Sequence, residues 1–251
     1  MFELLGLDKV KYLGRKLDKK MFYDNGDLSK EDKKIFIEYI DKIEMSYILN
    51  SSTLNIAPFI NNEYYYEAIV YLNVKLKQQD KIDKISKIIN NNIPNPLVII
   101  YEFDKEYCIS TAIKRLSKTD KNKTVVEESN ITNWLNINSL TENDTKFIDS
   151  ISLRKIPYTN LFDFYKTIND KIYIFKISDN MGGYEDISDK KALEESKQIL
   201  EKIEKLEDEL NRTIKKLKKE SQFNKKMDLN IKATSLDKKI KELKIFYKDN
   251  Y

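Results

Sequence analysis

Residues 188–248 run SDKKALEESKQILEKIEKLEDELNRTIKKLKKESQFNKKMDLNIKATSLDKKIKELKIFYK and contain neither glycine nor proline. Leucine and isoleucine recur there at steps of three and four residues: Leu200, Ile203, Leu206, Leu210 and Ile214. This spacing puts aliphatic side chains on one narrow stripe of a helix, which is typical of a coiled-coil seam and must be covered by another helix. The sequence therefore predicts a helical arm over residues 186–251, attached to a globular body over residues 1–185.

The charge along the arm indicates how it folds. Residues 194–209 carry seven acidic and three basic side chains, whereas residues 227–248 carry six basic and three acidic ones. If the chain turns back near residues 221–224, these two segments lie side by side and their opposite charges pair across the helices. We therefore expect an antiparallel hairpin. The alternative is one continuous helix that pairs with a second copy, which would make the protein a homodimer.

Between these segments lies the most basic part of the chain. Residues 210–226 hold seven basic side chains and a single acid, Glu220: Arg212, Lys215, Lys216, Lys218, Lys219, Lys225 and Lys226. Such a concentration attracts nucleic-acid phosphates or an acidic protein, although lysine-rich helix faces are also common as merely solvated surfaces. Phe223 and Met227 are apolar and lie outside the seam, so they are candidate partner-contact residues or residues that close the bend.

The body alternates helix and strand patterns. Helical spacing predicts helices over residues 30–45, 80–92 and 159–175. Strand patterns cover residues 54–57, 64–77, 97–103, 107–113 and 131–137. The polar residues 117–130 predict a surface loop. The resulting element order predicts an α+β fold, in which an antiparallel sheet has its helices packed on one face.

Composition excludes several kinds of chemistry. The chain has no histidine and one cysteine, Cys108, so we expect no disulfide within the chain, no cysteine metal site and no histidine-activated nucleophile. Cys108 lies in an apolar strand pattern, which favours a buried, inert thiol. We predict no catalytic residue, no metal site and no cofactor.

One weak alternative is a divergent metal-dependent nuclease that uses Glu67, Lys75 and Lys77 on a single strand. Carboxylates of such enzymes bind Mg²⁺ while a lysine positions water. Asn73 stands where these sites usually have a carboxylate, two residues before the lysine. The pattern therefore favours an exposed strand face with scattered charge.

The expected location is the cytoplasm. No apolar run reaches 18 residues, and the N-terminus has no apolar leader pattern, so we expect no membrane span and no secretion signal. The net charge of +4 comes from the C-terminal part, because residues 188–251 hold 18 Lys and Arg against 13 Asp and Glu.

Several segments together resemble a known family. RKLDKKMFYDN at residues 15–25, VKLK at 74–77, INNNIPNPLVII at 89–100 and especially KKESQFNKKMDLN at 218–230 are similar to the uncharacterised bacterial domain-of-unknown-function family 4391. The family pattern has a proline where this chain has Asp18. The resemblance implies no established active site. It implies a genetic neighbourhood with DNA methyltransferases and helicase-like restriction proteins.

These observations lead to a functional expectation. We expect a non-catalytic accessory subunit of a bacterial restriction or antiviral defence assembly that targets DNA. It would bind a larger helicase-like or methyltransferase subunit, with the basic arm contacting DNA or that partner. The alternatives are the nuclease described above and a homodimerising scaffold.

Overall fold

The computed structural model describes residues 1–24, 28–121, 123–156, 159–178 and 181–251. The chain divides into two compact units, which we call the sheet unit, Met1–Lys176, and the hairpin unit, Ile177–Tyr251. Among the described residues, none of the helices combines the length and the apolar character that crossing a bilayer would need.

The elements follow one another in this order. The sheet unit contains η1 (Leu7–Lys9), β1 (Arg15–Leu17), α1 (Lys20–Asp24), α2 (Lys30–Tyr39), β2 (Ile40–Asn50), α3 (Ser51–Leu54), β3 (Phe59–Ile60), β4 (Tyr65–Tyr66), β5 (Ala68–Leu76), α4 (Ile82–Asn92), β6 (Leu97–Phe103), β7 (Glu106–Leu116), β8 (Thr124–Ile131), β9 (Leu135–Asn136) and α5 (Glu142–Ser150). The next helix, α6, covers Leu161–Ser178, and the hairpin unit continues with α7 (Lys190–Lys219) and α8 (Phe223–Asn250).

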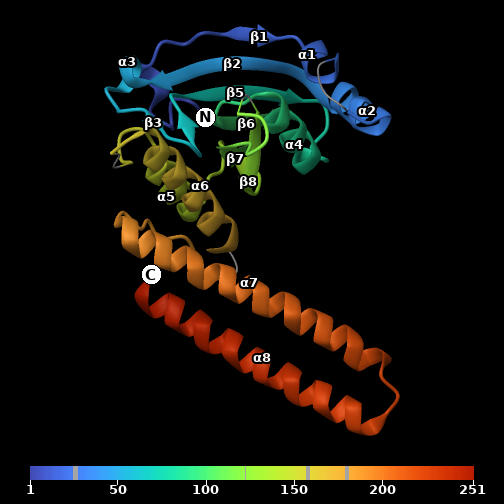
Figure 1. Ribbon diagram of the computed structural model, residues 1–251. Helices are drawn as coiled ribbons and strands as arrows, with labels where there is room; N and C mark the ends of the chain where they lie inside the picture. The colour runs from blue at the N-terminus through green and yellow to red at the C-terminus, as the bar shows by residue number, and fades with distance from the viewer. Residues whose placement is uncertain (25–27, 122, 157–158, 179–180) are drawn as a thin grey trace. The chain divides into compact units, whose positions relative to one another are not determined.

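The sheet is mixed but mostly antiparallel, and the predicted α+β class is confirmed (Figure 1). Its strands are ordered β1-β2-β5-β6-β7-β8, with β9 paired to β7. All these pairs are antiparallel except β5 and β6, which are parallel and are connected through α4. A parallel pair needs such a crossover because its two strands start at the same edge of the sheet.

Helices α4 and α6 pack on opposite faces of the sheet, rather than on the one face that the sequence predicted. Cys108 on β7 belongs to the same core cluster as Ile85 and Ile89 of α4. Thr111, three residues further along β7, donates a 2.9 Å hydrogen bond from Oγ1 to Oδ1 of Asn169 on α6. Residues three apart on a strand point to opposite faces. Both faces of the central strands are therefore covered, which explains why β6 is buried along most of its length.

The helix predicted over residues 30–45 is wrong in its second half, because α2 ends at Tyr39 and β2 begins at Ile40. The predicted start of this helix is correct: α2 begins at Lys30, and the side chain of Ser29 at the N-cap accepts a hydrogen bond from the backbone N–H of Asp32. Strand β2 pairs with β1 on one side and with β5 on the other. These ladders satisfy its backbone on both sides and override the local helical spacing. The strand predicted over residues 54–57 is also wrong, because Leu54 ends the short helix α3 and Ala57 forms only an isolated bridge, to Asn160.

Residues 124–131, predicted to fall mostly in a loop, form strand β8. Its register with β7 pairs Ile113 with Glu128 and Lys114 with Val126, so Glu127 is an extra residue, a β-bulge. Oε1 of Glu127 forms an ion pair with Nε of Arg115, at a distance of 3.0 Å. One face of β8 is partly exposed to solvent, so it carries charged and polar side chains. For this reason the sequence of β8 looks like a polar loop and not like a strand of alternating apolar and polar residues.

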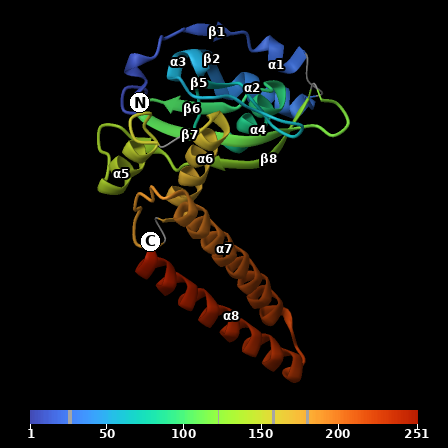
Figure 2. The same cartoon turned by 60° about the vertical axis from the view of Figure 1, so that its left-hand side comes forward.

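Helices α7 and α8 pack as the predicted antiparallel hairpin, and Figures 1 and 2 show them side by side from two directions. The connection covers residues 220–222, and the Glu220 side chain accepts hydrogen bonds from the backbone N–H groups of Ser221 and Gln222. The predicted charge pairing is confirmed. Nζ of Lys232 lies 2.7 Å from Glu209, and Nζ of Lys244 lies 2.6 Å from Glu207.

Candidate functional site

The seven basic residues predicted from the sequence gather at the closed end of the hairpin, where α7 ends and α8 begins. We call them the basic end, and all seven are exposed: Arg212, Lys215, Lys216, Lys218, Lys219, Lys225 and Lys226. The first five lie on the last two turns of α7, and the last two lie in the first turn of α8. The hairpin thus brings two segments of positive charge to one end of the unit.

Most of this charge has no acidic partner. Arg212 lies 3.8 Å from Asp208, one turn back on the same helix, and both side chains are exposed. Within the described part of the chain, the six lysines of the basic end form no ion pair within 4.0 Å. The electrostatic fields of neighbouring unpaired lysines add to one another, so this end of the hairpin presents a strong positive potential to solvent.

Helix stability explains only part of this charge. Lys216, Lys218 and Lys219 lie in the last turn of α7, where positive side chains interact favourably with the helix dipole. Lys225 and Lys226 lie in the first turn of α8, where the dipole is positive and lysine is unfavourable. That turn contains no acidic residue, and Gln222 at the N-cap accepts no hydrogen bond through its side chain. The two lysines of α8 therefore lack the structural explanation that those of α7 have.

The closed end is also hollowed. A cavity of about 490 Å³ lies between the two helix ends and is lined by Lys216, Lys219, Glu220, Lys225, Asp228 and Leu229. Three of these six residues are lysines of the basic end. Two others, Glu220 and Asp228, are acidic, so a group that enters this cavity meets lysines from both helices together with two carboxylates.

The two predicted partner-contact residues are exposed on α8. Phe223 is 78% exposed and Met227 is 53% exposed, and Ile231, which the sequence analysis did not single out, is 60% exposed. Spacing of four residues places them on one side of the helix. We call these three residues the apolar stripe. It begins in the same turn as Lys225 and Lys226, so apolar and basic surfaces adjoin.

The residues of the nuclease alternative are not brought together. Glu67 precedes β5 and its carboxylate accepts a hydrogen bond from the Tyr65 hydroxyl, while Lys75 lies near the other end of that strand. Eight residues of extended chain separate them by about 26 Å. Nor do the described residues include any group of three or more acidic, histidine or cysteine side chains placed to hold a metal ion.

Comparison with protein families matches residues 6–240 to the model described as a domain of unknown function, DUF4391. The chain belongs to the DUF4391 family. No curated protein and no solved structure matches it. The family description states no activity, so the function of this DUF4391 domain has to be argued from its own geometry.

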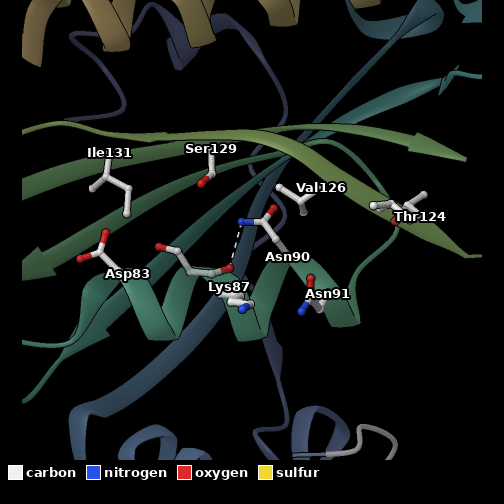
Figure 3. A pocket seen from close by; sticks show the side chains of 10 residues that line it. Asp83, Lys87, Asn90, Asn91, Thr124, Val126, Ser129 and Ile131 are labelled. Atoms are coloured by element: carbon white, nitrogen blue, oxygen red, sulfur yellow. Dashed lines mark hydrogen bonds between the residues drawn. The ribbon is translucent and has the colours of Figure 1, made fainter. Parts of the chain in front are cut away.

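The sheet unit of the DUF4391 domain holds a second candidate site that the sequence analysis missed. A cavity of about 600 Å³ lies between α4 and β8, and we call it the α4–β8 cavity (Figure 3). Its lining is Asp83, Ser86, Lys87, Asn90, Asn91, Thr124, Val125, Val126, Ser129 and Ile131. In the sequence, the residues from α4 form a polar stripe at helical spacing, but their opposing wall lies in the segment predicted as a loop.

Two buried ionisable side chains of the DUF4391 domain belong to its interior. Cys108 is buried, as the sequence predicted, and this burial raises the pKa of its thiol to about 12. Burial lowers the pKa of Lys114 to about 7. Its amine donates hydrogen bonds to the backbone oxygens of Ile93 and Asn95, so it has a structural partner at the end of α4.

Proposed function

We propose that this protein is a non-catalytic DNA-contacting subunit of a larger assembly, and that the basic end of its hairpin binds the phosphate backbone of double-stranded DNA. The observation that carries this proposal is the pair Lys225 and Lys226 in the first turn of α8. These side chains oppose the helix dipole and have no acidic partner among the described residues. A polyanion would relieve that unfavourable arrangement.

Three features of the basic end support DNA rather than a single small anion. Its charge is spread over two helices, it is exposed, and the apolar seam does not cover it. Lysine is a flexible point charge that contacts phosphates without reading bases. We therefore expect binding that depends little on sequence and falls steeply with salt concentration.

The proposal is tested with the full-length chain and a fluorescent DNA duplex, by anisotropy at several salt concentrations. The double variant Lys225→Glu/Lys226→Glu should weaken binding, and the slope of log K against log salt should become smaller by about 1–2. The matched control is Lys238→Glu/Lys239→Glu, an adjacent lysine pair further along the same helix. Equal affinity and equal slope for both double variants would refute a role for the basic end.

We further propose that the apolar stripe contacts a protein subunit of that assembly, a larger helicase-like or methyltransferase chain. Support comes from the exposure of Phe223, Met227 and Ile231 beside the basic end. The genetic neighbourhood that the family resemblance implies favours the same kind of partner. Large apolar side chains gathered on a surface are typical of protein interaction sites. A restriction or antiviral defence assembly is the setting that this proposal favours.

Co-purification with a larger helicase-like or methyltransferase chain, where one is encoded beside this protein, tests this second part. Met227→Glu should abolish co-purification, whereas Ile245→Glu, at a similarly exposed apolar position near the other end of α8, should not. The competing explanation is that a second copy of the chain covers the stripe, and the mass of the protein alone in solution tests it. A wild-type dimer that Met227→Glu converts into a monomer would identify a second copy, not a larger subunit, as the occupant of the stripe.

A further inference from the structure

The α4–β8 cavity has a floor made by one face of helix α4. The residues that it contributes are spaced at three and four residues, so they form one stripe: Asp83, Ser86, Lys87, Asn90 and Asn91. Ser86 is 3% exposed and Asn90 is 2% exposed, while the other three are exposed at the rim. A helix packed against a sheet normally buries apolar residues there. This stripe instead buries polar ones.

The opposite wall comes from β8 and depends on its bulge. Without the extra residue at Glu127, strand alternation would put residue 128 on the same face as Thr124 and Val126. The bulge shifts the phase, so Ser129 and Ile131 line the cavity, while Glu128 accepts a hydrogen bond from Asn169 of α6 on the other face. Bulges commonly re-aim side chains in this way at functional sites.

The decisive residue is Asn90. Its Nδ2 donates a 2.9 Å hydrogen bond to the backbone oxygen of Ser86, but its Oδ1 has no hydrogen-bond partner among the described residues. Figure 3 shows the Asn90 amide directed from the helix toward Ser129 and Val126 on β8. A buried acceptor without a partner costs free energy, which a ligand with an N–H group would recover.

The chemistry of the cavity defines the class of ligand. An amide NH₂ has two hydrogens, so Asn90 still offers one donor beside its unpaired acceptor. A planar edge with an adjacent donor and acceptor complements that pair, as the adenine edge does with asparagine. Val126 and Ile131 supply apolar contacts for the faces of a ring. The volume lies within the range of about 300–1,000 Å³ that small-molecule sites have.

The rim favours a charged ligand. Lys87 is exposed at the mouth of the cavity and forms no ion pair in the described part of the chain. Asp83, one turn earlier on α4, offers an acceptor for hydroxyl groups. We propose that the α4–β8 cavity binds a free nucleotide, with the base edge on Asn90, the ring against Val126 and Ile131, and the phosphate at Lys87. This site is separate from the DNA contact proposed for the hairpin unit.

Calorimetric titration of the full-length chain with AMP, GMP, CMP and UMP, each up to millimolar concentration, tests the proposal. At least one nucleotide should bind saturably. Asn90→Leu should weaken that binding by about tenfold or more, because two hydrogen bonds are lost and the base edge is left unpaired. Asn92→Leu is the matched control. Asn92 makes the same bond, 2.9 Å to the backbone oxygen of Ile88, but does not line the cavity.

A second variant and a second ligand show whether binding depends on the cavity and on the base. Ser129→Trp fills the cavity from an exposed strand position and should abolish binding even if Asn90→Leu fails to fold. Ribose 5-phosphate should not bind, since it lacks the base. The proposal is overturned if none of the four nucleotides binds, if Asn92→Leu weakens binding as much as Asn90→Leu, or if ribose 5-phosphate binds as tightly as the nucleotide. Lys225→Glu/Lys226→Glu should leave nucleotide binding unchanged, which separates this test from that of the hairpin.

Discussion

The amine of Lys114, on strand β7, lies 2.6 Å from the backbone oxygen of Ile93, the C-cap residue directly after helix α4. It also donates a 2.9 Å hydrogen bond to the backbone oxygen of Asn95. The last carbonyl groups of a helix have no partner within the helix. A lysine from the sheet here supplies a donor at the C-terminal end of α4, so the side chain joins the crossover helix to the strand layer.

Lys114 should make the stability of the protein depend on pH. Burial lowers its pKa from 10.5 to about 7 in the folded chain. Between these two values the unfolded chain binds more protons, so the free energy of unfolding rises with pH from about 7 to about 10.5. The shift corresponds to at most ~5 kcal/mol, and the two carbonyl groups reduce it because they stabilise the ammonium form.

The measurement is urea unfolding at several pH values, for the wild type and for Lys114→Met. The buried tyrosines titrate in both proteins, so the difference between the two stabilities isolates Lys114. That difference should shift in favour of the wild type as pH rises. A constant difference from pH 7 to 10 would show that the amine keeps its ordinary pKa in the folded protein.

A second prediction concerns the buried hydrogen bonds between the sheet and α6. Asn169 accepts from Thr111 and donates from Nδ2 to Glu128 at 2.9 Å, and both Asn169 and Thr111 are fully buried. Asn169→Leu should destabilise the protein by about 2 kcal/mol or more, because the Thr111 hydroxyl loses its acceptor. Fluorescence of Trp134, the single tryptophan, reports unfolding of the sheet unit.

The double variant Thr111→Val/Asn169→Leu provides the control. It removes both partners, so its cost should be smaller than the sum of the two single substitutions. Simple additivity would indicate that the two side chains contribute independently, contrary to the hydrogen bond between them.

How far the sequence predicted this fold depends on where each element finds its partners. The hairpin was predictable because its seam and its charge pairing follow from the spacing of residues close together in the sequence, from Leu200 to Ile240. Strand β2 was not, because residues 40–45 continue the helical spacing of α2 and become a strand only through pairing with β1 and β5. The placement of α6 on the second face depends on contacts such as the one between Thr111 and Asn169. These residues are far apart in the sequence, so no local pattern predicts that they meet.

The two candidate sites differ for the same reason. The basic end consists of residues close in sequence, so their charge was visible directly. The α4–β8 cavity needs Asn90 and Ser129 to face each other, and this requires both a strand within residues 117–130 and a bulge at Glu127. The polar residues of α4 at helical spacing were the one available indication, since a stripe of such residues on a helix that ought to pack on a sheet is unusual.

A third prediction follows from the burial of Cys108. The residue is 1% exposed, its Sγ lies 3.1 Å from the backbone oxygen of Thr132, and burial raises the pKa of the thiol to about 12. A thiol reagent should therefore modify the native protein only as fast as the protein unfolds, and should react at once in urea. Ser129→Cys, at an exposed position, should be modified immediately without urea. Rapid modification of native wild-type protein would contradict the buried position.

The last prediction separates the two apolar faces of α8. Leu236 is 6% exposed in the seam with α7, whereas Ile231 is 60% exposed in the apolar stripe. Leu236→Ala should destabilise the hairpin by about 2–4 kcal/mol, measured by circular dichroism during thermal unfolding, because it leaves a cavity in the seam. Ile231→Ala should change stability by no more than about 0.5 kcal/mol. Binding of the larger subunit should show the reverse order, with Ile231→Ala weakening it and Leu236→Ala retaining it at temperatures where the hairpin is folded. If Ile231→Ala destabilises the hairpin as much as Leu236→Ala, then Ile231 is part of the packing and the stripe is not a free surface.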